Sequence, residues 1–200
     1  VLAPASGVDA LVLSSLTIVE NTPTAGSADA VFAAADGKRL ALRYALQMGQ
    51  PFVETVAGGG ATGLRVEAPC RLAVLPDFFA DDIVIDAAEL SVPEAELPSD
   101  SFLLHLCSDC EAIVMTVVKE SQGDIRIALA GQGEDRVIES SALSYGKDGK
   151  IWVGVMAAPA IWHVRDVAEE QAGSVIRLDW KAPFPAAWRV DWRRDDGLCD

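Results

Sequence analysis

Apolar and polar residues alternate along much of the chain, most clearly between Arg39 and Leu46. Leu40, Leu42 and Tyr44 occupy every second position there, and Leu46 continues the series. A repeat of two residues is typical of a strand with one buried face and one wet face. The same repeat predicts further strands at 64–68, 124–129 and 175–180.

Turn residues separate these runs and predict antiparallel pairing. Asp36-Gly37 and Asp148-Gly149 lie between apolar flanks, and we expect two-residue hairpin turns there because glycine adopts the positive φ that such turns need. The segment 58–60 is three glycines, but no Gly-Lys-Ser/Thr follows it, so a phosphate-binding loop is disfavoured. We expect a hairpin connection at this point as well.

Denser apolar runs at 102–106, 112–118 and 151–156 are expected in the core. About fifteen short strands with regular turn spacing predict an all-β fold. We expect an antiparallel β-sandwich, supersandwich-like, with at most one or two short helices. It would form a single domain over residues 1–200, either complete or a fragment of a longer chain. In an alternative arrangement, residues 1–28 form a peripheral N-terminal ribbon.

The segment from Pro159 to Gly173 carries the pattern expected of a helix. Proline is compatible with a first helical turn and glycine with the position just past the last one. Ile161, Val164 and Val167 would then share the buried side.

Charge and composition limit the partners. The formal net charge is −14. This charge disfavours binding to nucleic acid, because proteins bind nucleic acid through clustered Lys and Arg. No apolar run reaches the roughly 20 residues needed to cross a bilayer, so membrane insertion is not expected. The chain begins at Val1 without a methionine, and we expect a protein that is secreted, periplasmic or at the cell surface. The composition also allows a homo-oligomer.

A cluster of tryptophan and arginine near the C-terminus is the candidate ligand-binding site. Indole faces stack on sugar rings, and guanidinium groups bind carboxylate or sulfate. If 188–193 is a strand, its tryptophans share one face and its arginines the other. The favoured interpretation therefore buries the tryptophans in the core, as is common in β proteins. The candidate residues are Trp180, Trp188, Arg189, Trp192, Arg193 and Arg194.

Asp77, Asp81 and Asp82 form a weak candidate calcium site. Calcium takes about six to eight oxygen ligands, and carboxylates supply them. The segment lacks the spacing of an EF-hand loop, so a solvated acidic turn is the favoured interpretation.

His105, Cys107 and Cys110 have a spacing that fits zinc, but one Cys-x-x-Cys needs a second pair to make the signal specific. The remaining cysteines are Cys70 and Cys199. Free thiols or a local disulfide are favoured over a metal, since many cysteines are small buried side chains. No metal site is therefore assigned.

The chain carries none of the common catalytic motifs: Gly-x-Ser-x-Gly, Ser-x-x-Lys and His-Glu-x-x-His are all missing. Side chains able to act as a base, Tyr44, Tyr145, His105 and His163, show no spacing that selects among them. We assign no catalytic residue and expect no cofactor.

Two stretches, 97–104 and 178–189, resemble the large β-sandwich modules of the galactose-mutarotase-like kind in secreted bacterial carbohydrate-active proteins. The resemblance implies a sandwich fold and carries no catalytic residue with it. The first hypothesis for function is a non-catalytic β-sandwich module of an exported bacterial protein, as the resemblance implies, that binds carbohydrate or packs against a neighbouring domain. The alternatives are a structural, self-assembling subunit and a polysaccharide-processing enzyme, lyase or hydrolase, or a fragment of one.

Overall fold

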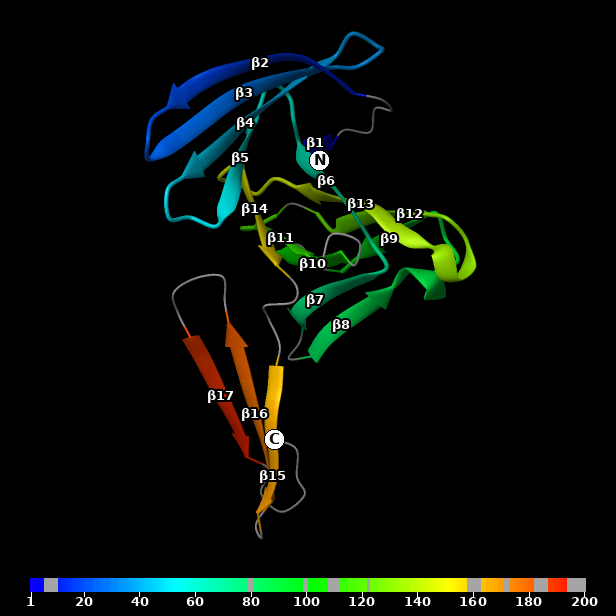
Figure 1. The fold of residues 1–200 in the computed structure, drawn as a ribbon. Helices are drawn as coiled ribbons and strands as arrows, with labels where there is room; N and C mark the ends of the chain where they lie inside the picture. Colours follow the sequence, from blue (N-terminus) through cyan, green and yellow to red (C-terminus); the bar gives the residue numbers. More distant parts are fainter. Residues whose placement is uncertain are drawn as a thin grey trace. The chain divides into compact units, whose positions relative to one another are not determined.

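Strands account for most of the structure, a computed structural model (Figure 1). It describes the backbone of residues 1–5, 11–78, 81–98, 101–107, 112–121, 123–157, 163–170, 173–181 and 187–193, and the side chains of this set up to 156, except 77, 78 and 81. Within these residues there are 17 strands, two short 3-10 helices and no α-helix. The chain divides into two compact units, Val1–Val155 and Met156–Asp200, each described by itself.

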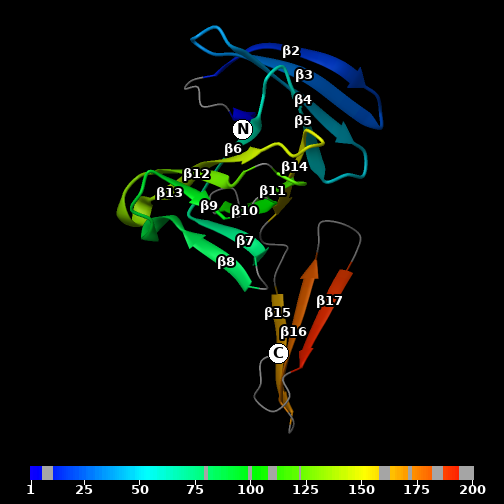
Figure 2. The same ribbon diagram turned by 180° about the vertical axis from the view of Figure 1, so that it is seen from behind.

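The first unit contains a nine-stranded antiparallel sheet, here called the large sheet, with the order β2-β3-β4-β5-β14-β11-β10-β7-β8. Figure 2 shows β2, β3 and β4 in blue at one end of this sheet. Its strands are β2 (Val12–Asn21), β3 (Ala25–Ala33), β4 (Arg39–Gln47), β5 (Phe52–Gly58), β7 (Leu72–Phe78), β8 (Asp81–Asp86), β10 (Phe102–Cys107), β11 (Ala112–Val118) and β14 (Lys150–Ala157).

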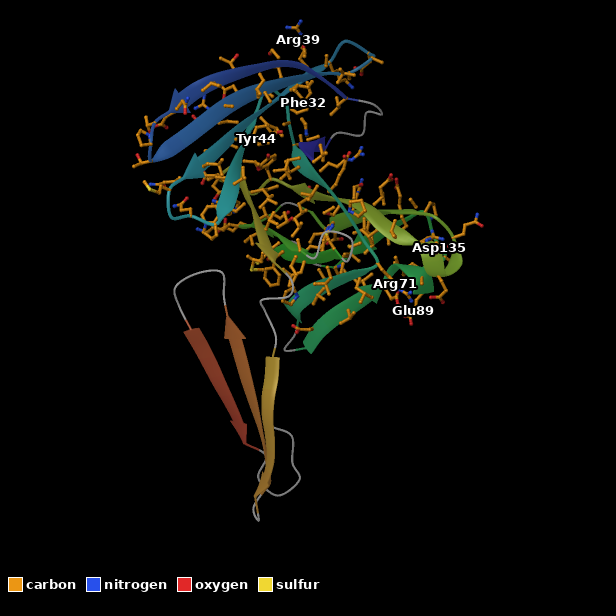
Figure 3. All side chains as sticks on the ribbon, in the orientation of Figure 1. Phe32, Arg39, Tyr44, Arg71, Glu89 and Asp135 are labelled. Atoms are coloured by element: carbon orange, nitrogen blue, oxygen red, sulfur yellow. The ribbon has the colours of Figure 1, made fainter. Side chains whose placement is uncertain are left out.

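A five-stranded sheet, the small sheet, has the order β1-β6-β13-β12-β9 and packs on one face of the large sheet. Its strands are β1 (Leu2–Ala5), β6 (Gly63–Cys70), β9 (Glu94–Leu97), β12 (Ile125–Ala130) and β13 (Val137–Ser144). The 3-10 helices η1 (Ala87–Glu89) and η2 (Gly133–Asp135) lie near each other, and Figure 3 shows Arg71, Glu89 and Asp135 gathered at that end. The all-β sandwich expected from the sequence is thereby confirmed.

The core lies between the two sheets. Each fully buried aliphatic side chain contributes about 1.5–3 kcal/mol relative to an exposed one. The main contributors are Leu42, Leu75, Leu103 and Ile151 from the large sheet and Leu64, Val66, Ile125, Ile127, Ile138 and Leu143 from the small sheet.

Polar bonds also cross between the layers. His105 of β10 reaches the small sheet through both ring nitrogens, with Nδ1 2.8 Å from the carbonyl oxygen of Ala68 and Nε2 3.0 Å from Oγ of Ser141. The hydroxyl of Tyr44 donates to the carbonyl oxygen of Leu2 at 2.9 Å. These bonds satisfy groups that would otherwise be buried without a partner.

The sequence locates seven of these strands, four from alternation and three from dense apolar runs. The run at 39–46 becomes β4, the run at 64–68 becomes β6, and the dense runs become β10, β11 and β14. One side chain of the alternating series departs from expectation: Leu40 and Leu42 are buried, whereas Leu46 is 56% exposed. It lies at the end of β4, and no part of the described core covers it.

The expected turns form, but two of them do not make hairpins. Asp36-Gly37 does join the paired strands β3 and β4, through a loop longer than two residues, in which the amide of Ala34 donates to the carbonyl of Lys38. Asp148-Gly149 and the glycine segment 58–60 instead connect strands of different sheets, so the hairpin prediction is wrong at both.

The glycine segment has a steric reason for its composition. Gly59 has a φ of +50°, and a Cβ built on it would lie 2.9 Å from the Cβ of Ala41. Only glycine fits a tight turn this close to the neighbouring strand.

The second unit contributes a three-stranded sheet of β15 (His163–Glu170), β16 (Gly173–Lys181) and β17 (Ala187–Arg193). The predicted helix is therefore wrong over 163–170. A bulge between Val164 and Asp166 sets Val164 and Val167 opposite Leu178 and Ile176, which are two residues apart. The bulge turns a helix-like spacing into a strand repeat, and β-branched valine favours the strand.

The expected N-terminal ribbon divides between the two layers. β1 pairs with β6 in the small sheet, while β2 is the terminal strand of the large sheet. The single-domain boundaries stay a prediction. Among the described residues, no helix is long and apolar enough to cross a membrane.

Candidate functional site

A row of residues crosses the outer face of the large sheet, the face turned away from the small sheet. Backbone pairing sets Glu20 opposite Ser27, Ser27 opposite Ala45, Ala45 opposite Glu54, and Glu54 opposite Trp152. The middle of this row is small and its two ends are large. Since opposite residues in antiparallel strands share a face, the row forms a groove with a low floor and raised ends.

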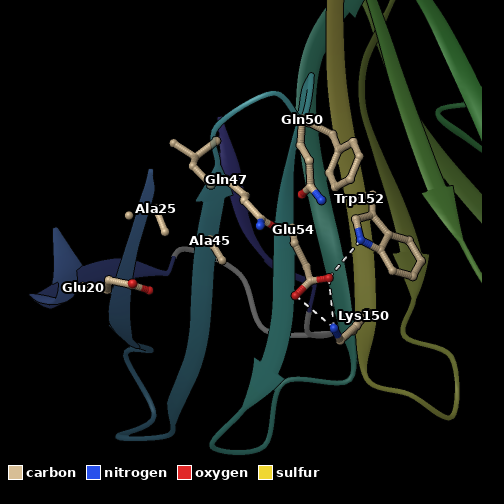
Figure 4. A pocket seen from close by; sticks show the side chains of 11 residues that line it. Glu20, Ala25, Ala45, Gln47, Gln50, Glu54, Lys150 and Trp152 are labelled. Atoms are coloured by element: carbon tan, nitrogen blue, oxygen red, sulfur yellow. Dashed lines mark hydrogen bonds and ion pairs between the residues drawn. The ribbon is translucent and has the colours of Figure 1, made fainter. Parts of the chain in front are cut away.

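Figure 4 shows this groove, with Ala25 and Ala45 on its floor between Glu20 and Glu54. It encloses about 480 Å³, which falls within the range of about 300–1,000 Å³ typical of small-molecule sites. Its lining residues are Glu20, Ala25, Gly26, Ala45, Leu46, Gln47, Gln50, Phe52, Glu54, Lys150 and Trp152.

Three side chains at the end formed by β5 and β14 hold one another in place. Nζ of Lys150 lies 3.0 Å from both carboxylate oxygens of Glu54, and Nε1 of Trp152 donates to Oε2 of Glu54 at 3.0 Å. Glu54 retains 26% of its side-chain exposure and Lys150 39%. The indole is therefore fixed in orientation while the group stays accessible from solvent.

The groove combines an aromatic wall with polar groups. Trp152 and Phe52 supply apolar ring surface, and Gln47 and Gln50 supply amide donors and acceptors. Lys150 neutralises the charge of Glu54. The net formal charge of the groove is therefore about −1, and it comes from Glu20. This arrangement suits a neutral molecule that has both an apolar face and hydroxyl groups.

The structure gives the predicted tryptophan and arginine site only as backbone. The segment 188–193 is extended as expected, and its pairing sets Trp180 opposite Trp188 and Asp179 opposite Arg189. The side chains of this segment, and all of Arg194, lie outside the described residues. The candidate site stays a prediction.

The candidate calcium segment forms the end of β7 and the start of β8, where Phe78 pairs with Asp81. The side chains of Asp77 and Asp81 lie outside the described residues. Asp86, the next acidic residue along β8, binds Arg71 through both carboxylate oxygens and accepts from the amide of Ala88. Among the described side chains, no three His, Cys, Asp or Glu residues lie close enough to hold a metal ion.

His105 and Cys107 alternate on the inner face of β10, and both are buried. Because a carbonyl only accepts, Nδ1 of His105 carries the proton and Nε2 accepts from Ser141. Burial lowers the pKa of His105. Cys70 and Cys107 are free thiols, and burial raises the pKa of Cys70 to about 12. A thiol with this pKa is unreactive at neutral pH. Cys110 lies outside the described residues.

The two tyrosines considered as bases have structural roles. Tyr145 donates to Oγ1 of Thr55 at 3.1 Å, and Thr55 donates to the carbonyl of Ile151 at 2.9 Å. Burial raises the pKa of Tyr145 and of Tyr44 to about 12, so both stay protonated at neutral pH. The side chain of His163 lies outside the described residues.

Comparison with family models, with curated proteins and with solved structures finds no match for this chain. The resemblance to galactose-mutarotase-like sandwich modules therefore stays a prediction.

The groove residues Glu54, Lys150 and Trp152 are absent from the sites predicted from sequence. A weak signal exists, since Lys150 and Trp152 alternate with the buried Ile151 and Val153 and must face outward. The pairing that brings Glu54 beside Trp152 spans 98 residues, and no local pattern contains it.

Proposed function

We propose that this protein is a non-catalytic binding module that takes a neutral glycan into the groove on the outer face of the large sheet. The observation that carries the proposal is the indole of Trp152, oriented by Glu54 and Lys150 above a floor of small side chains. Sugar rings have an apolar face that stacks on indole and hydroxyl groups that bond to carboxylate and amide groups.

The charge of the chain favours a neutral ligand over an acidic one. A net charge of −14 repels uronic acids and sulfated sugars. Glu20 adds a local negative charge to the groove. Lys150 cannot offset this repulsion, because it is already paired with Glu54.

The spacing of the two groove carboxylates supports binding over hydrolysis. Glu20 and Glu54 lie on β2 and β5, three strands apart, which corresponds to about 14 Å between their backbones. Glycosidases that use a carboxylate pair hold the two carboxyl groups about 5–9.5 Å apart. Here the carboxylate of Glu54 is bonded to Lys150 and Trp152 of β14, on the side of β5 away from Glu20. This groove therefore supports recognition of a glycan without cleavage. The expected bacterial origin and export stay predictions.

The test measures binding to neutral and acidic oligosaccharides, first on a glycan array and then by titration calorimetry. Trp152→Ala should weaken binding by about 30-fold, because an aromatic hot spot contributes about 2 kcal/mol. Trp152→Phe should retain part of the affinity, since it keeps a ring but loses the N–H donor. The melting temperature of each variant controls for folding.

Trp188→Ala is the matched control, since it removes an indole from the C-terminal candidate site and leaves the groove unchanged. We expect it to bind like the unmodified protein. Loss of binding in Trp188→Ala with full binding in Trp152→Ala would move the site to the C-terminal segment. Failure of the unmodified protein to bind any neutral glycan would overturn the proposal.

A further inference from the structure

Of the four terminal strands of the two sheets in the first unit, three carry features that oppose pairing with another chain. β1 is four residues long and contains Pro4, which lacks an amide hydrogen. β9 is equally short and exposes Glu94 and Glu96. β8 carries three aspartates in six residues. Short length, proline and charge are the devices that keep strand edges from pairing.

β2 lacks these three devices, and its two β-bulges, which also protect edges, leave the stretch Ser15–Ile18 between them regular. It is ten residues long, every residue is exposed, and Glu20 is its only ionisable side chain. It ends the large sheet, and within the described residues no strand pairs with its outer edge. Such an edge presents a row of backbone donors and acceptors that another strand can satisfy.

The face of β2 that continues the inner face of the sheet is also apolar. Leu16 and Ile18 stand opposite Ala30 and Ala28 of β3, on the side that carries the core. Leu16 is 59% exposed and Ile18 68%. An edge with free hydrogen-bonding groups and uncovered apolar side chains is a docking surface.

We propose that two copies of this protein pair through β2, antiparallel and about a twofold axis at Thr17, to join their large sheets into one. The stretch Ser15–Ile18 is regular, because the irregularities of β2 lie on either side of it, at Leu13/Ser15 and Ile18/Glu20. In this register Leu16 of one copy lies opposite Ile18 of the other, so the apolar side chains meet on the inner face, and Thr17 lies opposite Thr17.

The charge of the protein disfavours a second copy over most of the surface, and β2 is largely free of that repulsion. Each copy carries a net charge of −14, so like copies repel through most of their surface. β2 is the long edge in the first unit where they can approach with little repulsion, since this register sets Glu20 opposite the uncharged Ser14. A symmetric pair of identical surfaces is also the commonest geometry of soluble homo-oligomers.

The first test is the mass in solution, followed by sedimentation over a range of concentrations. The unmodified protein should be a dimer at the higher concentrations, and Ile18→Lys should be a monomer with an unchanged melting temperature. Val84→Lys is the matched control: Val84 is 62% exposed on β8, at the opposite end of the same sheet, and this variant should remain dimeric.

The second test fixes the register by cross-linking, in a background where Cys110 and Cys199 are serine. Opposite Cα atoms in antiparallel strands lie about 4.5–5.5 Å apart, within the range of a disulfide. Thr17→Cys should therefore form a covalent dimer under mild oxidation. Ser15→Cys is the control, because its two copies would lie about 13 Å apart along the seam.

Three outcomes would overturn the proposal. The first is an unmodified protein that is monomeric at all concentrations. The second is equal cross-linking of Thr17→Cys and Ser15→Cys. The third is a monomer in which Ile18→Lys lowers the melting temperature, since the edge would then be covered within one chain. Glycan binding is measured separately, so loss of the dimer and loss of the proposed groove function remain distinguishable.

Discussion

The two faces of the large sheet are built from the same strands but use their polar groups in different ways. On the inner face of β5 and β14, Thr55 bonds to Tyr145 and to the carbonyl of Ile151, and all three residues are buried. On the outer face, Glu54, Lys150 and Trp152 bond to one another at similar distances and remain partly exposed.

The difference lies in what each set of hydrogen bonds leaves for another molecule. A buried hydroxyl that has all its partners stabilises the fold and offers nothing to a ligand. A half-exposed group keeps an open side, so the same kind of bond orients a surface for recognition. We therefore expect substitutions on the inner face to change the free energy of unfolding, and substitutions on the outer face to change binding.

The largest effect on stability is expected from Ile151→Ala on the inner face. Ile151 is fully buried, and removing a large aliphatic side chain from a core costs about 3 kcal/mol. Val155→Ala, on the same strand but 63% exposed, should change the free energy of unfolding by less than about 0.5 kcal/mol. Urea unfolding at constant m-value measures both. Val155 lies on the same side of β14 as Ile151 but outside the core, so equal losses would show that burial does not set the cost at these positions.

A smaller loss, about 1–2 kcal/mol, is expected from Thr55→Val, because the hydroxyl of Tyr145 would lose its partner in the core. Tyr145→Phe should cost a similar amount. The double variant should lose less stability than the two single variants together, since both hydroxyl groups are then removed and neither is left without its partner. Strictly additive losses in the double-mutant cycle would show that the bond contributes nothing specific.

The pH dependence of stability tests the inner face through His105. Burial holds its pKa below the ordinary value of 6.5 in the folded protein. As the pH falls through about 6.5, the unfolded chain therefore takes up a proton first, and stability decreases. Urea unfolding between pH 7 and pH 5 should show this decrease.

His105→Asn should remove most of the slope, and His163→Asn, the other histidine, serves as the control. The aspartates with a lowered pKa affect stability over a separate pH range. The stability that they contribute is lost only as the pH falls through about 3.8 and below. A slope that survives in His105→Asn would assign the effect to another group.

A small effect on stability is expected from Lys150→Met on the outer face. A partly exposed ion pair contributes about 0–1 kcal/mol, and salt screens it. The difference from the unmodified protein should shrink further in 1 M salt, while glycan binding weakens because Glu54 and Trp152 lose their support. A loss of stability as large as that of Ile151→Ala would show that this end of the groove belongs to the core.

The sequence by itself determined that the chain is built of strands, where several of them lie and which side chains of the alternating ones point inward. The alternation at 64–68 identifies the buried face of β6, whereas the dense apolar run at 102–106 predicts a core strand without showing that His105 points inward. This is possible because a strand repeats every two residues, and the repeat is written in neighbouring positions of the chain.

Only the tertiary structure decided which strand lies beside which. The turn at Asp148-Gly149 has the residues of a hairpin but passes from one sheet to the other, and β15 is a strand because β16 pairs with it. The groove depends on the same kind of choice, since it joins Glu20, Glu54 and Trp152 from distant parts of the chain. Such pairings are selected by the burial of the whole core, so no local pattern of residues can specify them.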